Sequence, residues 1–211
     1  MRQPRPVPAR AVRTGTVVER SRFLCVLEPV PGEAAADDVV AAVRREFPDA
    51  RHHCTARVLG DDGQVRRASD DGEPAGTAGA PMLAALDGAG VTDVVAVVVR
   101  WFGGVLLGTG GLVRAYGGAV AGALAEAGTV HRRRVELVQV RAGLAEAGRV
   151  EAELRRRHAV EDVAWGADGW RAVVAVPAGG GGALAAELAA AGLTPGTTRL
   201  SDLGPAVRPL P

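Results

Sequence analysis

The chain has 211 residues, 47% of them hydrophobic and 23% charged, a globular composition that allows one large or two small domains. Its formal net charge is +1, so the overall charge gives no reason to expect nucleic acid or an anionic membrane as a partner. All 25 side chains counted as lysine or arginine are arginine, which excludes a Schiff-base lysine and the lysine of a P-loop.

The first part of the chain predicts a tail followed by a strand-rich domain with three helices. Residues 1–13 are rich in proline and arginine and contain no acid, so we expect a disordered tail there. The apolar patterns predict, in chain order, strands at 16–18 and 23–27, a helix from Asp37 or Asp38 to Pro48, a strand at 52–60, a helix containing Met82 and Leu86, a strand at 93–99 and a helix at 112–127. The last of these strands is a β-branched run, which is typical of a strand buried on both faces.

The remainder predicts a second domain over residues 135–203, after a first domain over 14–130, with the boundary near His131–Arg134. Its expected elements are a strand at 135–140, a helix at 145–158, a hairpin at 159–176 with its turn at 167–169, a helix at 179–192 and a strand at 194–201. This order, β-α-β-β-α-β, is that of a ferredoxin-like unit. Residues 205–211 are expected to fray.

No part of the sequence predicts secretion or a membrane span. The N-terminus lacks the apolar core of a signal peptide, and the longest apolar run, 94–99, is far too short to cross a bilayer. We therefore expect a cytoplasmic protein.

A glycine-rich stretch, "RWFGGVLLGTGGLVRAYGG" at 100–118, lies between the buried strand and a helix. A strand, a glycine-rich turn and a helix N-terminus together form an anion site, because backbone N–H groups and the helix dipole converge there. Thr109 can cap this helix, and arginines on both sides of the turn can clamp a phosphate. The alternative is that the glycines only permit close packing of helix and sheet. The candidate anion-binding residues are Arg100, Gly103, Gly104, Gly108, Thr109, Gly110, Gly111 and Arg114.

A polar loop, "SDDGEPAGTAG", carries three carboxylates in four residues, Asp70, Asp71 and Glu73. They can hold a divalent cation, accept hydrogen bonds from arginines, or fix the shape of the loop. Thr77 can start the next helix.

The run "HHC" at 52–54 suggests two kinds of chemistry, metal binding and nucleophilic catalysis. On a strand His52 and Cys54 share one face and His53 takes the other, and two ligands are too few for zinc. The same geometry disfavours Cys54 as a nucleophile with a histidine base. We therefore predict no metal centre and no cofactor, and keep His52 and His53 as candidate residues of a functional loop.

These motifs together resemble the IMPACT/YigZ family. The likeness runs through "SRF" at 21–23, "HHCTARVLG" at 52–60, "SDDGEPAGTAGAPML" at 69–83 and "VVVRWFGGVLLGTGGLVRAYGGAV" at 97–120. It implies an α+β fold. The N-terminal domain would be of the ribosomal-protein-S5-domain-2-like type, with helices packed on one face of a sheet. The ferredoxin-like C-terminal domain would resemble domain V of elongation factor G. The chain departs from many relatives at Trp101, where they have tyrosine.

The resemblance also implies a function. Eukaryotic members bind a partner protein and restrain a kinase that shuts down translation initiation. We therefore expect a non-enzymatic, translation-associated regulator, with RNA, the ribosome or a translation-associated protein as its partner. Two alternatives stay open: a Mg-dependent enzyme acting on a nucleotide or phosphorylated small molecule, and a protein-interaction module.

Overall fold

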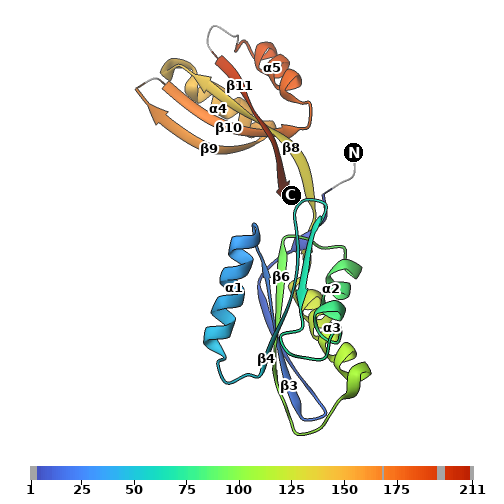
Figure 1. Ribbon diagram of the computed structural model, residues 1–211. Helices are drawn as coiled ribbons and strands as arrows, with labels where there is room; N and C mark the ends of the chain where they lie inside the picture. Colours follow the sequence, from blue (N-terminus) through green and yellow to red (C-terminus); the bar gives the residue numbers. More distant parts are fainter. Residues whose placement is uncertain (1–3, 168, 194–197, 210–211) are drawn as a thin grey trace. The chain divides into compact units, whose positions relative to one another are not determined.

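The computed structural model describes residues 4–167, 169–193 and 198–209, and these divide into two compact α+β units. The division lies between Arg132 and Arg133, inside the range 131–134 where a boundary was expected. Figure 1 shows the elements of each unit.

The N-terminal unit is built on a five-stranded antiparallel sheet of order β2-β3-β6-β4-β5. Its elements are β1 (Val7–Pro8), β2 (Val12–Val18), β3 (Ser21–Pro29), α1 (Glu33–Glu46), β4 (His52–Leu59), β5 (Val65–Ser69), α2 (Gly79–Gly88), β6 (Val94–Trp101), α3 (Gly108–Ala127) and β7 (Thr129–Val130). The β-branched run forms the central strand β6, and residues 94–100 are buried, as the sequence predicted.

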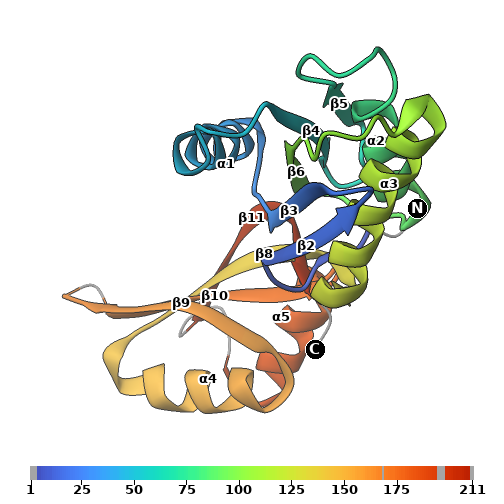
Figure 2. The same ribbon diagram turned by 90° about the horizontal axis from the view of Figure 1, so that it is seen from below.

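Helices cover both faces of this sheet (Figures 1 and 2). Helices α2 and α3 pack on one face, around Phe23, Met82 and Tyr116. Helix α1 packs on the other face, where Val43 and Val97 belong to one apolar cluster. The expectation that helices lie on one face only is therefore wrong, because alternate valines of β6 supply an apolar surface on each side.

Three predicted boundaries differ from the structure. Residues 7–8 pair with β7 and β2 begins at Val12, so the expected tail is ordered over 4–13, while 1–3 lie outside the described residues. Helix α1 begins at Glu33, one turn before the expected Asp37 or Asp38, and the Asp37 carboxylate instead accepts a hydrogen bond from Arg57. Helix α3 begins at Gly108 rather than 112, because glycine's low helix propensity hid its first turn.

The C-terminal unit is the expected β-α-β-β-α-β arrangement, and its four-stranded sheet has the order β11-β8-β10-β9. Its elements are β8 (Arg132–Ala142), α4 (Leu144–Arg157), β9 (Ala159–Gly166), β10 (Gly169–Pro177), α5 (Gly181–Ala190) and β11 (Thr198–Pro209). The core lies between sheet and helices, around the buried Trp170. Strand β11 continues through 205–209, which were expected to fray. Residue 168 of the expected turn and 194–197 of the expected last strand lie outside the described residues.

Candidate functional site

A buried ion pair joins the polar loop to the end of the central strand. The guanidinium of Arg100 donates from Nη1 to Oε1 of Glu73 at 2.6 Å, and only 5% of Arg100 and 8% of Glu73 is exposed. The same Oε1 accepts a 2.7 Å hydrogen bond from the hydroxyl of Tyr116 on α3. Burial raises the pKa of Tyr116 well above its usual range, so this hydroxyl stays protonated and remains a donor. The desolvation of two charges is costly, and this pair is therefore weak evidence for stability and stronger evidence for a fixed arrangement.

The serine at the start of β3 completes this network. Oγ of Ser21 accepts hydrogen bonds at 3.3 Å from Nη2 of Arg100 and from the backbone N–H of Gly103. The remaining guanidinium nitrogen, Nε of Arg100, is buried and has no hydrogen-bond partner among the described residues. Arg100 is therefore held from two sides, and its charge is already balanced by Glu73.

His52 lies beside the ion pair in a fixed orientation. Its Nδ1 lies 2.8 Å from the carbonyl oxygen of Asp71, and because a carbonyl only accepts, Nδ1 carries the proton. In the neutral ring Nε2 then keeps its lone pair, and it lies 3.9 Å from Oε1 of Glu73. The backbone of the loop thus sets which nitrogen of His52 faces the carboxylate.

A cavity of about 420 Å³ opens above these groups. Its lining is largely apolar, with polar groups from His52, Glu73 and Arg100, and it includes residues of the first turn of α3. That helix has no side-chain cap at its N-terminus, so its first N–H groups have no side-chain acceptor. The lining residues are Arg51, His52, Glu73, Pro74, Arg100, Phe102, Leu106, Leu107, Gly108, Thr109 and Leu112. A concave, mostly apolar site with a few converging polar groups is the usual form of a binding site.

The two arginines predicted to clamp one phosphate line different cavities. Arg114 is exposed and lines a neighbouring cavity of about 430 Å³ together with Glu19 and Gly111. Arg100 is turned inward and paired with Glu73. The structure therefore does not build a clamp from both, because a buried carboxylate already holds one of them. Thr109 lies within the first turn of α3 and does not cap it, since the cap position is Leu107.

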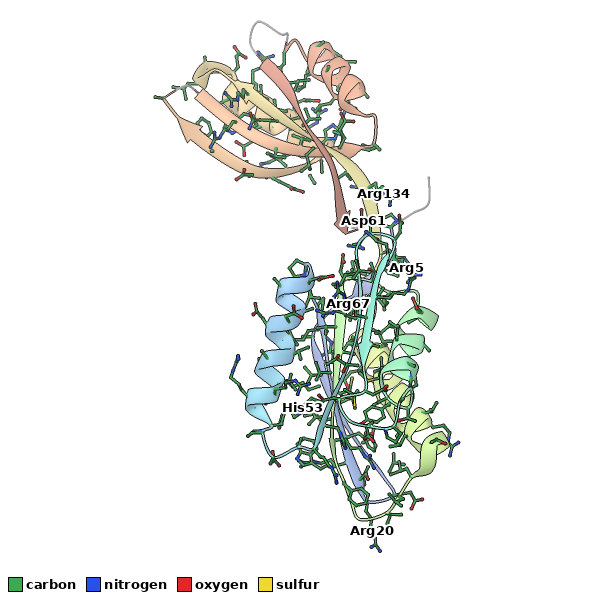
Figure 3. The ribbon with its side chains drawn as sticks, viewed as in Figure 1. Arg5, Arg20, His53, Asp61, Arg67 and Arg134 are labelled. Carbon is green, nitrogen blue, oxygen red and sulfur yellow. The ribbon has the colours of Figure 1, made fainter. Side chains whose placement is uncertain are left out.

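The glycines of this stretch serve different purposes. A Cβ on Gly103 would lie 2.0 Å from backbone atoms of Arg20, so glycine there is required by the close approach of two chain segments. Figure 3 labels Arg20 at the tip of the β2–β3 hairpin. Gly104 and Gly108 have φ of +85° and +68°, which favours glycine for backbone reasons. Gly110 and Gly111 lie in the first turn of α3. Packing thus accounts for Gly103, whereas Gly108 lines the cavity and Gly111 lines the neighbouring one.

The two aspartates of the polar loop fix its shape. Oδ1 of Asp70 accepts from the N–H groups of Ala78 and Gly79 and Oδ2 from that of Gly76, so Asp70 ties the loop to the start of α2. Asp71 accepts from Arg44 at 2.6 Å and from the N–H of His53 at 2.7 Å. The hydroxyl of Thr77 donates to the carbonyl of Pro74, and α2 begins at Gly79 rather than at Thr77. These contacts favour hydrogen bonding over cation binding among the alternatives left open for the loop.

Replacement of Asp70 with alanine is expected to cost about 1–2 kcal/mol of stability at neutral pH, because the N–H groups at the start of α2 lose their acceptor. Burial alone would raise the pKa of Asp70, but the N–H groups of Gly76, Gly79 and Ala78 outweigh it and hold this pKa below its usual range. A carboxylate whose pKa is lowered on folding stabilises the fold at pH values above its pKa in the unfolded state. This stabilisation is lost as the pH falls through its pKa in the folded state. The free energies of unfolding of wild type and Asp70→Ala, measured with urea, should therefore become equal at acid pH. If the difference between them stayed constant down to the pH at which Asp70 is protonated, the role of Asp70 as an acceptor for the N–H groups at the start of α2 would be contradicted.

The side chains of His53 and Cys54 both contact backbone carbonyl groups of the fold. Nε2 of His53 lies 3.0 Å from the carbonyl of Phe47, on the α1 side of the sheet (Figure 3). The Cys54 thiol donates to the carbonyl of Asp70, and burial raises its pKa to about 12. A thiol with such a pKa is a poor nucleophile near neutrality, which agrees with the reading that disfavoured covalent catalysis.

Sequence reasoning missed two residues of the polar network, Ser21 and Tyr116, and six of the cavity lining: Arg51, Pro74, Phe102, Leu106, Leu107 and Leu112. Tyr116 carried a signal: it is the only tyrosine of the chain and falls on the buried stripe of a helix, where a hydroxyl needs an acceptor. The others join the site only through the fold.

None of the helices in the described part of the chain combines the length and the apolar character that a membrane crossing needs.

Several known proteins are similar to this chain in sequence. Residues 19–124 match the family model described as the Impact N-terminal domain. The IMPACT family member YigZ of Escherichia coli (strain K12) is 57% identical over 120 residues, which are 56% of this chain and 59% of that protein. The chain thus spans less than two thirds of that relative. An IMPACT family member from Thermus thermophilus, described as lying in the pol 5′ region, is 42% identical over 79% of this chain and 89% of its own length.

A solved structure, described as the crystal structure of a hypothetical protein, resembles the whole chain. It is 40% identical, with a TM-score of 0.67 over 95% of this chain and 97% of that one.

Proposed function

This chain belongs to the IMPACT family, and from that premise we propose that it is a non-enzymatic, translation-associated regulator of the cytoplasm that binds a phosphate-bearing partner, RNA or the ribosome. The proposed contact is the cavity beside the first turn of α3. The resemblance carried by the motifs implies the link to translation.

The observation that carries the proposal is the uncapped N-terminus of α3 beside an exposed arginine in one cavity. Arg51 and the residues Gly108 and Thr109 line it together. Because Arg100 and Glu73 balance each other, the excess positive charge comes from Arg51 and the helix N-terminus. Arg114 extends this charge into the neighbouring cavity. A phosphate oxygen is the natural acceptor for such a set of donors.

The carboxylates favour binding over Mg-dependent catalysis. Asp70 and Asp71 are engaged by backbone N–H groups and by Arg44, and of the three loop carboxylates only Glu73 lines the cavity. A Mg²⁺ site needs carboxylate oxygens free to coordinate the ion. Here Glu73 is instead held by Arg100 and Tyr116.

A second candidate function, a protein-interaction module, is favoured by the apolar wall of the same cavity. Phe102 is 45% exposed and Leu106 87% exposed. Large apolar side chains that are exposed together on a surface are typical of protein contacts. In this alternative the contact is made by the loop between β6 and α3.

The test replaces exposed arginines and leaves the buried one in place. An Arg51→Gln, Arg114→Gln double variant removes two cations without disturbing the Glu73–Arg100 pair. We expect weaker binding of a fluorescein-labelled single-stranded RNA, measured by anisotropy over a range of salt concentrations. If each arginine contacts one phosphate, the slope of log K against log salt should fall by about 1.4.

The matched control is Arg13→Gln, Arg67→Gln, which removes the same charge from two arginines paired with Glu46 and Glu33. An equal loss in the control would mean non-specific attraction, and an unchanged affinity and slope in the test variant would overturn the RNA proposal. Loss of partner binding in Leu106→Asp, with no RNA bound by wild type, would favour the protein-interaction module instead.

A further inference from the structure

Two arginines lie directly opposite each other in the sheet of the C-terminal unit. The register of β8 and β10 pairs Arg141 with Arg171, and both side chains are exposed. Directly opposed residues on neighbouring antiparallel strands hold their side chains on the same face, and like charges there are unfavourable. The next strand, β9, places the small Ala164 opposite Arg171 and offers no compensating charge at that position.

No described carboxylate forms an ion pair with either guanidinium. Arg141 donates from Nε to the amide oxygen of Gln139 at 2.8 Å, and because this amide is neutral the bond does not balance the charge of Arg141. Arg171 has no hydrogen-bond or ion-pair partner among the described residues. The arginines of helix α4 behave differently: Arg155, for example, pairs with Glu151 at 2.8 Å. The Arg141–Arg171 pair is thus a local concentration of positive charge that no carboxylate of the described residues neutralises.

Both arginines line one cavity of about 220 Å³ at the end of the β9–β10 hairpin. Two glycines, Gly166 and Gly169, line it as well. Gly169 has φ of +111°, and a Cβ there would lie 2.4 Å from the carbonyl oxygen of Ala142, so a larger residue is excluded. The exposed Trp165 is also part of the lining. Paired guanidiniums over a glycine surface form a site for a small polyvalent anion.

We propose that Arg141 and Arg171 form a phosphate site in the C-terminal unit, which takes a phosphate of single-stranded RNA or of a free nucleotide. This site is separate from the cavity of the N-terminal unit and does not rest on the function proposed for it. A phosphate between the two guanidiniums relieves their repulsion and accepts hydrogen bonds from both. The like-charge pair is then explained as a binding feature that costs some stability in the absence of ligand.

The test uses the full chain and three single variants, Arg141→Gln, Arg171→Gln and the control Arg155→Gln, which removes the same charge from helix α4. Inorganic phosphate, AMP and a fluorescein-labelled single-stranded RNA are titrated separately. Binding is followed by the amide chemical shifts of Gly166 and Gly169, and for RNA also by anisotropy. We expect Arg141→Gln and Arg171→Gln each to weaken binding about tenfold and Arg155→Gln to leave it unchanged.

The source of the phosphate follows from the same titrations. RNA that binds much more tightly than AMP identifies a nucleic-acid strand, and AMP that binds as tightly as RNA identifies a free nucleotide. Variants that bind all three probes like wild type, or glycine amides that do not shift, would overturn the site. An equal loss in Arg155→Gln would reduce it to non-specific attraction and overturn it as well.

Thermal unfolding supplies a second readout that a merely structural role would not produce. In phosphate-free buffer Arg171→Gln should unfold at a higher temperature than wild type, because the like-charge contact is removed. Added phosphate should raise the wild-type midpoint and leave that of Arg171→Gln nearly unchanged. A variant that is less stable than wild type in both buffers would contradict the proposal.

Discussion

Replacement of Glu73 with alanine is expected to cost about 3–5 kcal/mol of folding free energy, because it leaves the buried Arg100 without its counter-ion. The hydroxyl of Tyr116 loses its acceptor in the same step, since both groups donate to Oε1 of Glu73. Only 3% of the Glu73 side chain and 7% of the Arg100 side chain is exposed, so water does not replace the lost contact at low cost. Urea unfolding of the full chain, followed by circular dichroism, measures the change.

Two further variants separate charge from packing at this pair. The double variant Glu73→Leu, Arg100→Met removes both charges and should recover much of the lost stability, because a buried ion pair is close to neutral against apolar residues of similar size. Glu33→Ala breaks the exposed pair with Arg67 and should cost below about 1 kcal/mol. If Glu73→Ala were as mild as Glu33→Ala, the cavity would have to hydrate Arg100, and the buried network would lose its explanation.

The elements that the sequence predicted well are those whose pattern is local. The β-branched run of β6 and the alternation of β4 identify strands without knowledge of their neighbours. The first turn of α3 was missed because Gly108, Gly110 and Gly111 resemble a loop when only propensity is considered. The predicted start of helix α1 lies one turn too late because Gly32, at the cap position, has no side chain that marks a helix N-terminus.

The sequence predicted which residue types take part in the site, but not which of them contact each other. The sequence marks Arg100 and Glu73 as candidates and allows the loop carboxylates to bind arginines, but it does not show that these two residues, 27 positions apart, are the ones that pair. Arg100 and Arg114 flank the same glycine stretch and look equivalent in sequence. The register of β6 turns Arg100 inward, whereas Arg114 remains exposed on α3. Which arginine is paired inside the fold and which stays exposed is thus a tertiary property.

Replacement of Gly103 with alanine is expected to destabilise the protein by about 2–4 kcal/mol, although the stretch looks permissive in sequence. The added Cβ would lie 2.0 Å from the carbonyl carbon and oxygen of Arg20 and 2.5 Å from the nitrogen of Ser21. These are backbone atoms, so no rotamer change relieves the clash. The loop after β6 or the β2–β3 hairpin would have to move, and the hydrogen bond from Gly103 to Ser21 would be lost.

The same substitution at Gly118 should have the opposite sign. A Cβ on Gly118, within α3, meets no atom within 4 Å, and removal of a glycine from a helix interior stabilises it by roughly 0.5–1 kcal/mol. Urea midpoints of Gly103→Ala and Gly118→Ala should therefore fall on either side of wild type. If both variants were stabilised, close packing would not account for Gly103, and the need for glycine there would have to come from a ligand that approaches the backbone. The sign of the Gly103 substitution thus decides, at this position, between close packing and the approach of a ligand.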